Sequence, residues 1–101
     1  MIIHVIATNR SVELEDAQNF RAFAIRIEGT LADAAELLKA FSESVDGDHA
    51  WVSERALREW RGLADKAWWQ EGLTKMIGAA QRFGWVDLGN KAIRAHIEYA
   101  P

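Results

Sequence analysis

Residues 20–28 read Phe-Arg-Ala-Phe-Ala-Ile-Arg-Ile-Glu, and side chains of one kind recur at every second position of this run. A period of two is the spacing of a β-strand, because successive side chains of a strand point to opposite faces of the sheet. Phe23, Ile25 and Ile27 then share one apolar face, and Gly29 ends the run. The opposite, mixed face carries Ala22, Ala24, Arg26 and Glu28.

Two further strands are expected before this run. Residues 2–7 read Ile-Ile-His-Val-Ile-Ala, and their β-branched side chains favour a strand. Residues 11–15 alternate polar and apolar side chains, and residues 16–19 have the composition of a turn. The first third of the chain therefore predicts an antiparallel hairpin that ends at Gly29.

The apolar spacing then changes to the period of an α-helix. It predicts an amphipathic helix over residues 31–45, which Asp46-Gly47-Asp48 ends. Ser53 is expected to cap a second helix and Asp65 a third, which Gly84 ends.

The chain closes with an expected strand over residues 91–99, and a short extra strand near residues 85–87 is an open alternative. The expected order is β-β-α-α-α-β. Because strands and helices are segregated along the sequence, we expect one α+β domain over residues 1–101. Its expected architecture is a two-layer sandwich, in which three helices cover one face of a small antiparallel sheet.

Composition excludes several classes of function. The chain has no cysteine, which rules out disulfides and thiolate chemistry, and its net charge is −3. Residues 1–50 carry four basic and nine acidic side chains, whereas residues 51–101 carry eight basic and six acidic. This balance argues against nucleic acid or an anionic membrane as a partner. The first residues lack the pattern of a signal peptide, so a cytoplasmic location is expected.

The expected sheet offers one candidate site. If the helices cover the face that contains Ile25, then His4, Arg26, Arg94, His96 and Glu98 emerge on the other face. Two imidazoles and a carboxylate suit general acid–base catalysis, with the guanidinium groups holding an anion. The alternatives are a solvated polar face or a homodimer interface. No residues show the spacing of a metal or phosphate motif, so we expect no metal and no cofactor.

The tryptophans supply a second candidate. All five lie within residues 51–85, and Trp60 and Trp69 fall on the apolar stripes of the expected helices. Trp68 points about 100° away from Trp69 around the helix, and Gly72 lies one turn further on. Glycine in a helix costs about 1 kcal/mol relative to alanine, which suggests that something packs closely there. Another backbone element, a partner protein or a flat ligand would satisfy this requirement.

The layout of residues 53–99 is helix, helix, hairpin, with Gly84-Trp85-Val86 entering the hairpin. This layout resembles the winged-helix domains, and the resemblance implies a nucleic-acid-binding protein. It differs from them in the part that would contact nucleic acid, because the expected hairpin has only Lys91 and Arg94 as basic residues.

The leading hypothesis is a protein that binds a small aromatic or apolar ligand. If it is an enzyme, the residues favour cofactor-independent isomerase or lyase chemistry, with His4, His96 and Glu98 as catalytic groups. Arg26, Arg94, Trp68 and Gly72 would then contact the ligand. One alternative is a protein-interaction module that docks through Trp68, Gly72 and Ala79, and a second is the winged-helix nucleic-acid reader.

Overall fold

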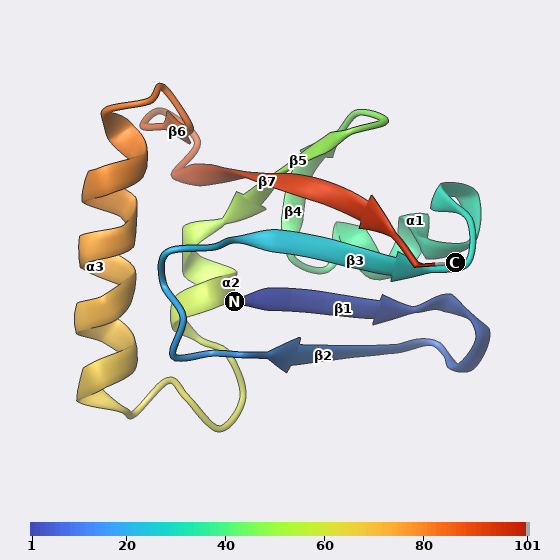
Figure 1. The fold of residues 1–101 in the computed structure, drawn as a ribbon, viewed down its shortest axis with the longest axis horizontal. Helices are drawn as coiled ribbons and strands as arrows, with labels where there is room; N and C mark the ends of the chain where they lie inside the picture. Colours follow the sequence, from blue (N-terminus) through green and yellow to red (C-terminus); the bar gives the residue numbers. More distant parts are fainter. Residues whose placement is uncertain (101) are drawn as a thin grey trace.

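Seven strands form one mixed sheet in the computed structural model, which describes residues 1–100 (Figure 1). The strand order is β2-β1-β3-β7-β5-β4, and β6 pairs with the first residues of β7. β3 lies parallel to both β1 and β7, whereas the other pairings are antiparallel. The bounds are β1 Ile2–Ile6, β2 Ser11–Glu15, β3 Ala24–Glu28, β4 Ser42–Val45, β5 His49–Ser53, β6 Val86–Asp87 and β7 Ala92–Tyr99.

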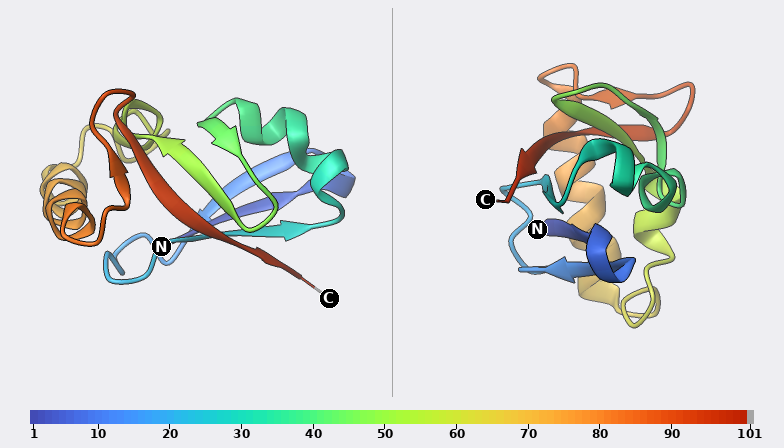
Figure 2. Two further views of the ribbon diagram at one scale, coloured as in Figure 1. Left: turned by 90° about the horizontal axis from the view of Figure 1, so that it is seen from above. Right: turned by 90° about the vertical axis from the view of Figure 1, so that its right-hand side faces the viewer.

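Three α-helices accompany the sheet: α1 (Leu31–Lys39), α2 (Glu54–Arg58) and α3 (Ala67–Gln81). α1 and α2 lie behind the sheet, and α3 stands across one end of the strands (Figures 1 and 2). A short 3-10 turn, Ala7–Asn9, joins β1 to β2. No helix in the described part of the chain is both long enough and apolar enough to cross a membrane.

Side chains cap the N-termini of two helices, and one of them is the expected Ser53. The hydroxyl of Thr30 accepts a hydrogen bond from the Asp33 backbone N–H, and that of Ser53 accepts one from Ala56. Asp65 was expected to cap α3, but the N-cap is Lys66, whose side chain makes no capping hydrogen bond.

The single α+β class is confirmed, but the small antiparallel sheet is wrong. β1 and β2 form an antiparallel hairpin, whereas β3 lies parallel on the other edge of β1. This pairing sets Ile3 opposite Ile25 and Val5 opposite Ile27, which joins their apolar faces. Alternation alone identifies the buried face of a strand but not its direction or its neighbour. Of residues 20–28, only residues 24–28 are in the strand.

The helix expected over residues 31–45 ends at Lys39, and a β-hairpin takes its place. β4 and β5 pair antiparallel around the turn at residues 46–48, where the Asp46 carboxylate accepts backbone hydrogen bonds from Asp48 and His49. The helical spacing continued by chance through β4. The decisive signal lay in β5, where Ala50 and Val52 alternate as buried residues with more exposed neighbours.

The core lies between the apolar face of the sheet and the helices. The face predicted from alternation is confirmed, because Ile3, Ile25 and their partners on β1, β3 and β7 are buried. Trp69 is fully buried, and its indole N–H donates to the Leu57 carbonyl at 2.9 Å. Trp60 is partly buried against Phe41, with ring centroids 6.3 Å apart.

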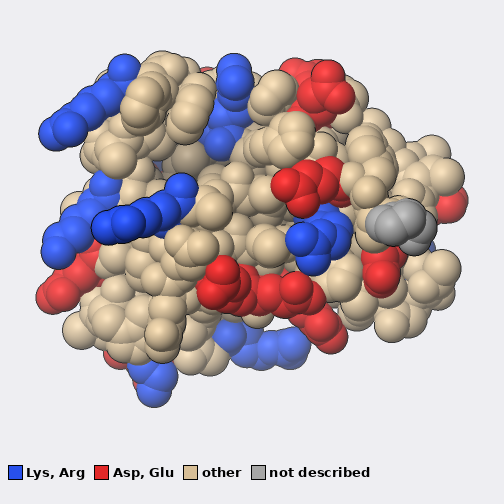
Figure 3. All heavy atoms as spheres, in the orientation of Figure 1, with Lys and Arg blue, Asp and Glu red and all other residues tan. Residues whose placement is uncertain are grey.

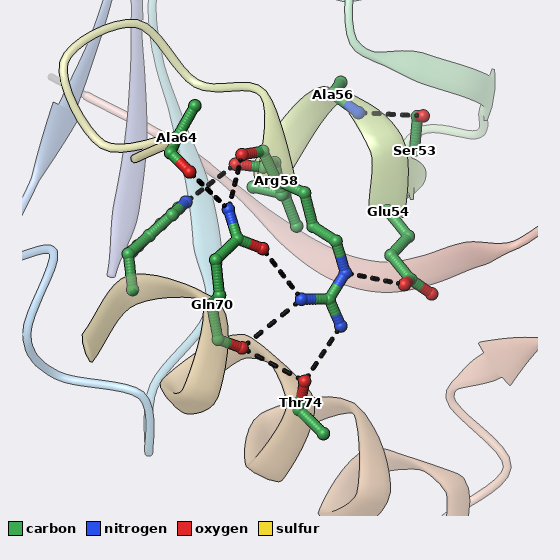
Figure 4. A network of polar contacts seen from close by, with 9 residues as sticks. Ser53, Glu54, Ala56, Arg58, Ala64, Gln70 and Thr74 are labelled. Carbon is green, nitrogen blue, oxygen red and sulfur yellow. Dashed lines mark hydrogen bonds and ion pairs between the residues drawn. The ribbon is translucent and has the colours of Figure 1, made fainter. Parts of the chain in front are cut away.

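A polar network connects α2 to α3 (Figure 4). The Arg58 guanidinium donates to Glu54 at 2.8 Å, to the Gln70 side chain at 3.0 Å and to the Thr74 hydroxyl at 3.0 Å. The Gln70 amide in turn donates to the backbone carbonyls of Arg58 and Ala64. Because hydrogen bonds to a charged group are strong, this network holds α3 against α2.

Candidate functional site

A cleft of about 600 Å³ lies between the C-terminal half of α3, the first residues of β7 and the loop before β3. Aromatic side chains supply much of its wall: Phe20 and Phe23 come from the loop, and Phe83 and Trp85 from the segment after α3. This volume falls within the range of small-molecule sites, about 300–1,000 Å³.

The helical wall follows directly from the sequence period. Met76, Ala79, Ala80 and Phe83 are spaced at three and four residues, so they lie on one face of the helical segment. The two alanines leave space between the larger side chains of this face. The helical wall of the cleft therefore includes two small side chains.

The turn after α3 places two large rings at the entrance of the cleft. Gly84 has a φ of +74°, a value that glycine adopts without strain, and the turn lets Phe83 and Trp85 stack with centroids 4.7 Å apart. Phe83 is 66% exposed and Trp85 41% exposed. Two aromatic rings of this size thus face solvent side by side.

Every ionisable side chain that lines the cleft is a cation or an imidazole. Arg21 comes from the loop, Lys75 from α3 and Arg94 from β7, and His49 and His96 complete the set. Within residues 1–100, none of the three cations is in an ion pair with a carboxylate. Basic side chains gather toward α3 and acidic side chains over the strands in Figure 3. The cleft is therefore a basic region of an acidic protein.

Two of these groups are held by cross-strand pairing. His49 on β5 lies directly opposite His96 on β7, and their ring centroids are 5.8 Å apart. The Arg94 guanidinium lies over the Trp85 ring at 6.0 Å, which is a cation–π distance. The sequence reasoning named His96 and Arg94 but not His49 as a site residue, because it did not recognise β5 as a strand.

The turn beside His49 carries a carboxylate with a perturbed pKa. The backbone N–H groups of His49 and, to a lesser degree, Asp48 donate to Asp46 and lower the pKa of its carboxyl below 3.8. His49 Nδ1 lies 3.9 Å from the same carboxylate. The ionised Asp46 thus holds the turn that presents His49 to the cleft.

His4, Arg26 and Glu98 lie in a second polar region, on the outer face of β1, β3 and β7. We call this region, with Glu15 and Glu28, the outer patch. His4 Nδ1 is 2.5 Å from Glu15, and Arg26 lies 3.9 Å from Glu15 and 3.8 Å from Glu98. The charges of the outer patch are therefore paired with one another.

One nitrogen in the outer patch lacks a hydrogen bond. His4 Nε2 is buried and has no hydrogen-bond partner in the described structure, although a Glu28 oxygen lies 3.4 Å away. Atoms of His4, Glu13 and Glu15 that could ligate a metal lie within 4.8 Å of one another. The hydrogen bond between His4 and Glu15 brings two of these three residues together.

The predicted catalytic residues fall into these two separate regions. His4 and His96 are on strands separated by β3, and they pair with Arg26 and Ala24 respectively on that strand. Glu98 was predicted to be a catalytic group, but it lies in the outer patch, 3.8 Å from Arg26. Only His96 and Arg94 of the predicted sheet residues line the cleft.

Gly72 has a close neighbour, as its cost in the helix suggested. A Cβ at this position would lie 2.2 Å from the ring of Phe20, so the glycine makes room for this aromatic side chain. Trp68 packs edge-on against the same ring, with centroids 6.4 Å apart. Both predicted residues therefore support Phe20, which itself lines the cleft.

The β6–β7 hairpin that resembles the wing of a winged helix is part of the seven-stranded sheet. β6 and β7 do pair after α3, but β7 also pairs with β3 and β5 and is a central strand.

No protein-family model matches this chain, and no curated protein or solved structure is similar to it at a significant level. The inference of function therefore rests on the cleft itself.

Proposed function

We propose that this protein binds a small aromatic or apolar ligand in the cleft between α3 and β7. The observation that carries the proposal is the combination of a volume of about 600 Å³ with a wall of aromatic side chains. Ligand sites typically join an apolar wall to a few convergent polar groups. Here Arg94, His49 and His96 supply those groups.

The exposed rings at the entrance support the same proposal. Phe83 and Trp85 keep a large apolar area in contact with water, and burial of such area contributes about 25 cal/mol per Å². A ligand that stacks on this pair would gain that contribution without moving the backbone. Exposed apolar patches with a polar margin commonly mark binding sites.

A filling variant tests the proposal directly. Ala79→Phe places a ring into the cleft, whereas Gln81→Phe adds the same side chain to α3 outside it. We expect a fragment library of small aromatic and apolar compounds to give hits by saturation-transfer NMR. Ala79→Phe should abolish those hits, and Gln81→Phe should retain them. A library without hits, or hits that survive in Ala79→Phe, would overturn the proposal.

Proton transfer by paired histidines is a second candidate function. The juxtaposition of His49 and His96 in the cleft favours it, because one imidazole can accept a proton while the other donates. This arrangement needs no cofactor and suits an isomerase or a lyase. His4 lies outside the cleft, so the proposed acid–base pair is His96 with His49.

Deuterium exchange into a bound ligand tests the catalytic candidate. NMR in D2O would follow the loss of carbon-bound protons from each library hit. We expect exchange that His96→Ala and His49→Ala each reduce by about 10²-fold or more, while His4→Ala leaves it unchanged. Binding without any exchange would retain the binding proposal and reject catalysis.

The two alternative classes have less support. A protein dock through Trp68, Gly72 and Ala79 would find Gly72 already covered by Phe20 and Ala79 within the cleft wall. A nucleic-acid reader could use the three cations of the cleft, but the glutamates of the outer patch on the same sheet would repel the phosphates.

A further inference from the structure

We infer that the ligand of this cleft is an aromatic carboxylate, with its ring against Phe83 and Trp85 and its carboxylate toward Arg94. The inference rests on the proposed function and narrows it to one chemical class. It combines two independent properties of the wall, its charge and its aromatic character.

The charge of the cleft is the first property. Arg21, Lys75 and Arg94 come from a loop, a helix and a strand, and no Asp or Glu is among the residues that line the cleft. By contrast, Arg26 and Arg58 each lie close to a carboxylate elsewhere in the molecule. Three cations in the wall, of which Arg94 also interacts electrostatically with the Asp46 carboxylate beside His49, favour an anion as the ligand.

Arg94 is the best placed of the three cations. It is partly buried on β7, and its guanidinium already lies over the Trp85 ring. A planar guanidinium donates two parallel hydrogen bonds to a carboxylate, and it also stacks on aromatic faces. One residue can therefore hold the carboxylate beside the ring that stacks on the ligand.

The aromatic wall is the second property. Phe20, Phe23, Phe83 and Trp85 all line the cleft, and the stacked pair offers a flat surface. Offset stacking of aromatic rings adds about 0.5–1.5 kcal/mol beyond area burial. A planar ring thus gains more from this wall than a flexible aliphatic chain does.

A phosphate group fits the cleft less well. Phosphate sites commonly use backbone N–H groups at the N-terminus of a helix. This cleft is instead lined by the C-terminal half of α3, where the helix dipole disfavours dense negative charge. A singly charged carboxylate is therefore the better match.

Three probes of one shape test the inference: 2-naphthoate, the neutral 2-naphthalenemethanol and the cationic 2-naphthylmethylamine. Their affinities are measured at low salt from amide shifts in NMR spectra. We expect 2-naphthoate to bind about tenfold tighter than the alcohol and the amine to bind weakest. The alcohol lacks the negative charge of the carboxylate, and the cations of the cleft repel the positively charged amine. Sodium chloride at 0.5 M should reduce the preference by screening.

Matched variants assign the preference to one residue. Arg94→Gln should bring 2-naphthoate to the affinity of the alcohol, whereas Arg61→Gln, an exposed cation outside the cleft, should leave the tenfold ratio intact. The dispersion of the NMR spectrum reports whether each variant is folded. If Arg94→Gln unfolds, the salt dependence in the unaltered protein decides the question.

The outcomes separate the inference from the proposed function. Equal binding of 2-naphthoate and the alcohol would overturn the carboxylate inference and leave the binding proposal standing. Tightest binding by the amine would also overturn the inference. Failure of all three probes to shift any cleft residue would overturn the inference, and the fragment library with Ala79→Phe would then decide the binding proposal by itself.

Discussion

The outer patch and the cleft are both rich in ionisable side chains, but their charges are arranged in opposite ways. In the outer patch, His4 and Arg26 each have carboxylates within 4 Å. In the cleft, Arg21, Lys75 and Arg94 form no ion pair with any carboxylate of residues 1–100.

This difference in charge pairing indicates that the cleft is the better candidate for a binding site. Oppositely charged side chains that pair on an exposed sheet contribute modestly to stability. Their electrostatic fields largely cancel, so they attract a charged ligand only weakly. Cations that form no ion pair beside an apolar wall can attract an anionic ligand. On the proposed function, the same residue types stabilise the fold in the outer patch and contact a ligand in the cleft.

The largest effect should come from removing the residue that anchors the helical wall of the cleft. Trp69→Ala deletes a fully buried ring and its indole hydrogen bond to the Leu57 carbonyl, so we expect a loss of about 3–5 kcal/mol in the free energy of unfolding. Trp68→Ala, its 41% exposed neighbour, should cost less than about 1 kcal/mol. Urea denaturation of both variants measures the contrast, and similar losses would contradict this account of α3.

Substitutions at two glycines of α3 should have smaller effects on stability, and the two sites form a matched pair. Gly72→Ala forces the Phe20 ring to move, so we expect a loss of about 1–3 kcal/mol and weaker ligand binding. Gly78→Ala meets no atom within 4 Å and should gain about 0.5–1 kcal/mol from helix propensity. Thermal unfolding of the two variants should show shifts of opposite sign. A stabilised Gly72→Ala protein would show that Phe20 is not seated as described.

Neutralising one charge in each region tests the comparison itself. Glu15→Gln removes the partner of His4 and Arg26, so stability should fall by about 0.5–1 kcal/mol. Arg21→Gln removes a cation without an ion pair, so stability should change by less than about 0.5 kcal/mol while the affinity for 2-naphthoate falls. Denaturation and NMR titration together measure both effects. If Arg21→Gln destabilised the fold and Glu15→Gln weakened the binding of 2-naphthoate, the contrast between the outer patch and the cleft would be wrong.

The smallest effect concerns pH at the turn of the β4–β5 hairpin. The folded pKa of Asp46 is lowered below 3.8, so its carboxylate stabilises the fold above that pH and loses this contribution as pH falls through the lower folded value. We expect Asp46→Ala to unfold at a lower temperature than the unaltered protein at pH 7. The difference should shrink below pH 3, as measured by circular dichroism. A gap that stays constant with pH would show that ionisation of Asp46 does not hold the turn.

The buried faces were predictable from alternation and helical spacing. The period of two in β1, β3 and β7 correctly sorted Ile3 and Ile25 into the core. The period of α3 likewise identified Trp69 as a core residue. Such patterns report burial because each element must hide one side from water.

The cleft could not be predicted in the same way. Its walls come from α3, β7 and the loop before β3, and their juxtaposition depends on tertiary packing rather than on any local period. The helical spacing from Leu31 to Val45 also masked the β4–β5 hairpin, which concealed His49. Phe20 was assigned to a strand, so its place over Gly72 had no signal in the local pattern.

The central position of β7 has a consequence for how the molecule assembles. β7 bridges β3 and β5, yet it follows both of them in the chain, with 63 residues between the end of β3 and its own start. Until β7 inserts, β3 and β5 each present an open hydrogen-bonding edge that can join strands of other chains. Pairing over long sequence separations is slow to nucleate. Folding intermediates that lack β7 should therefore be the species most prone to aggregate, and they would lack the β7 wall of the cleft.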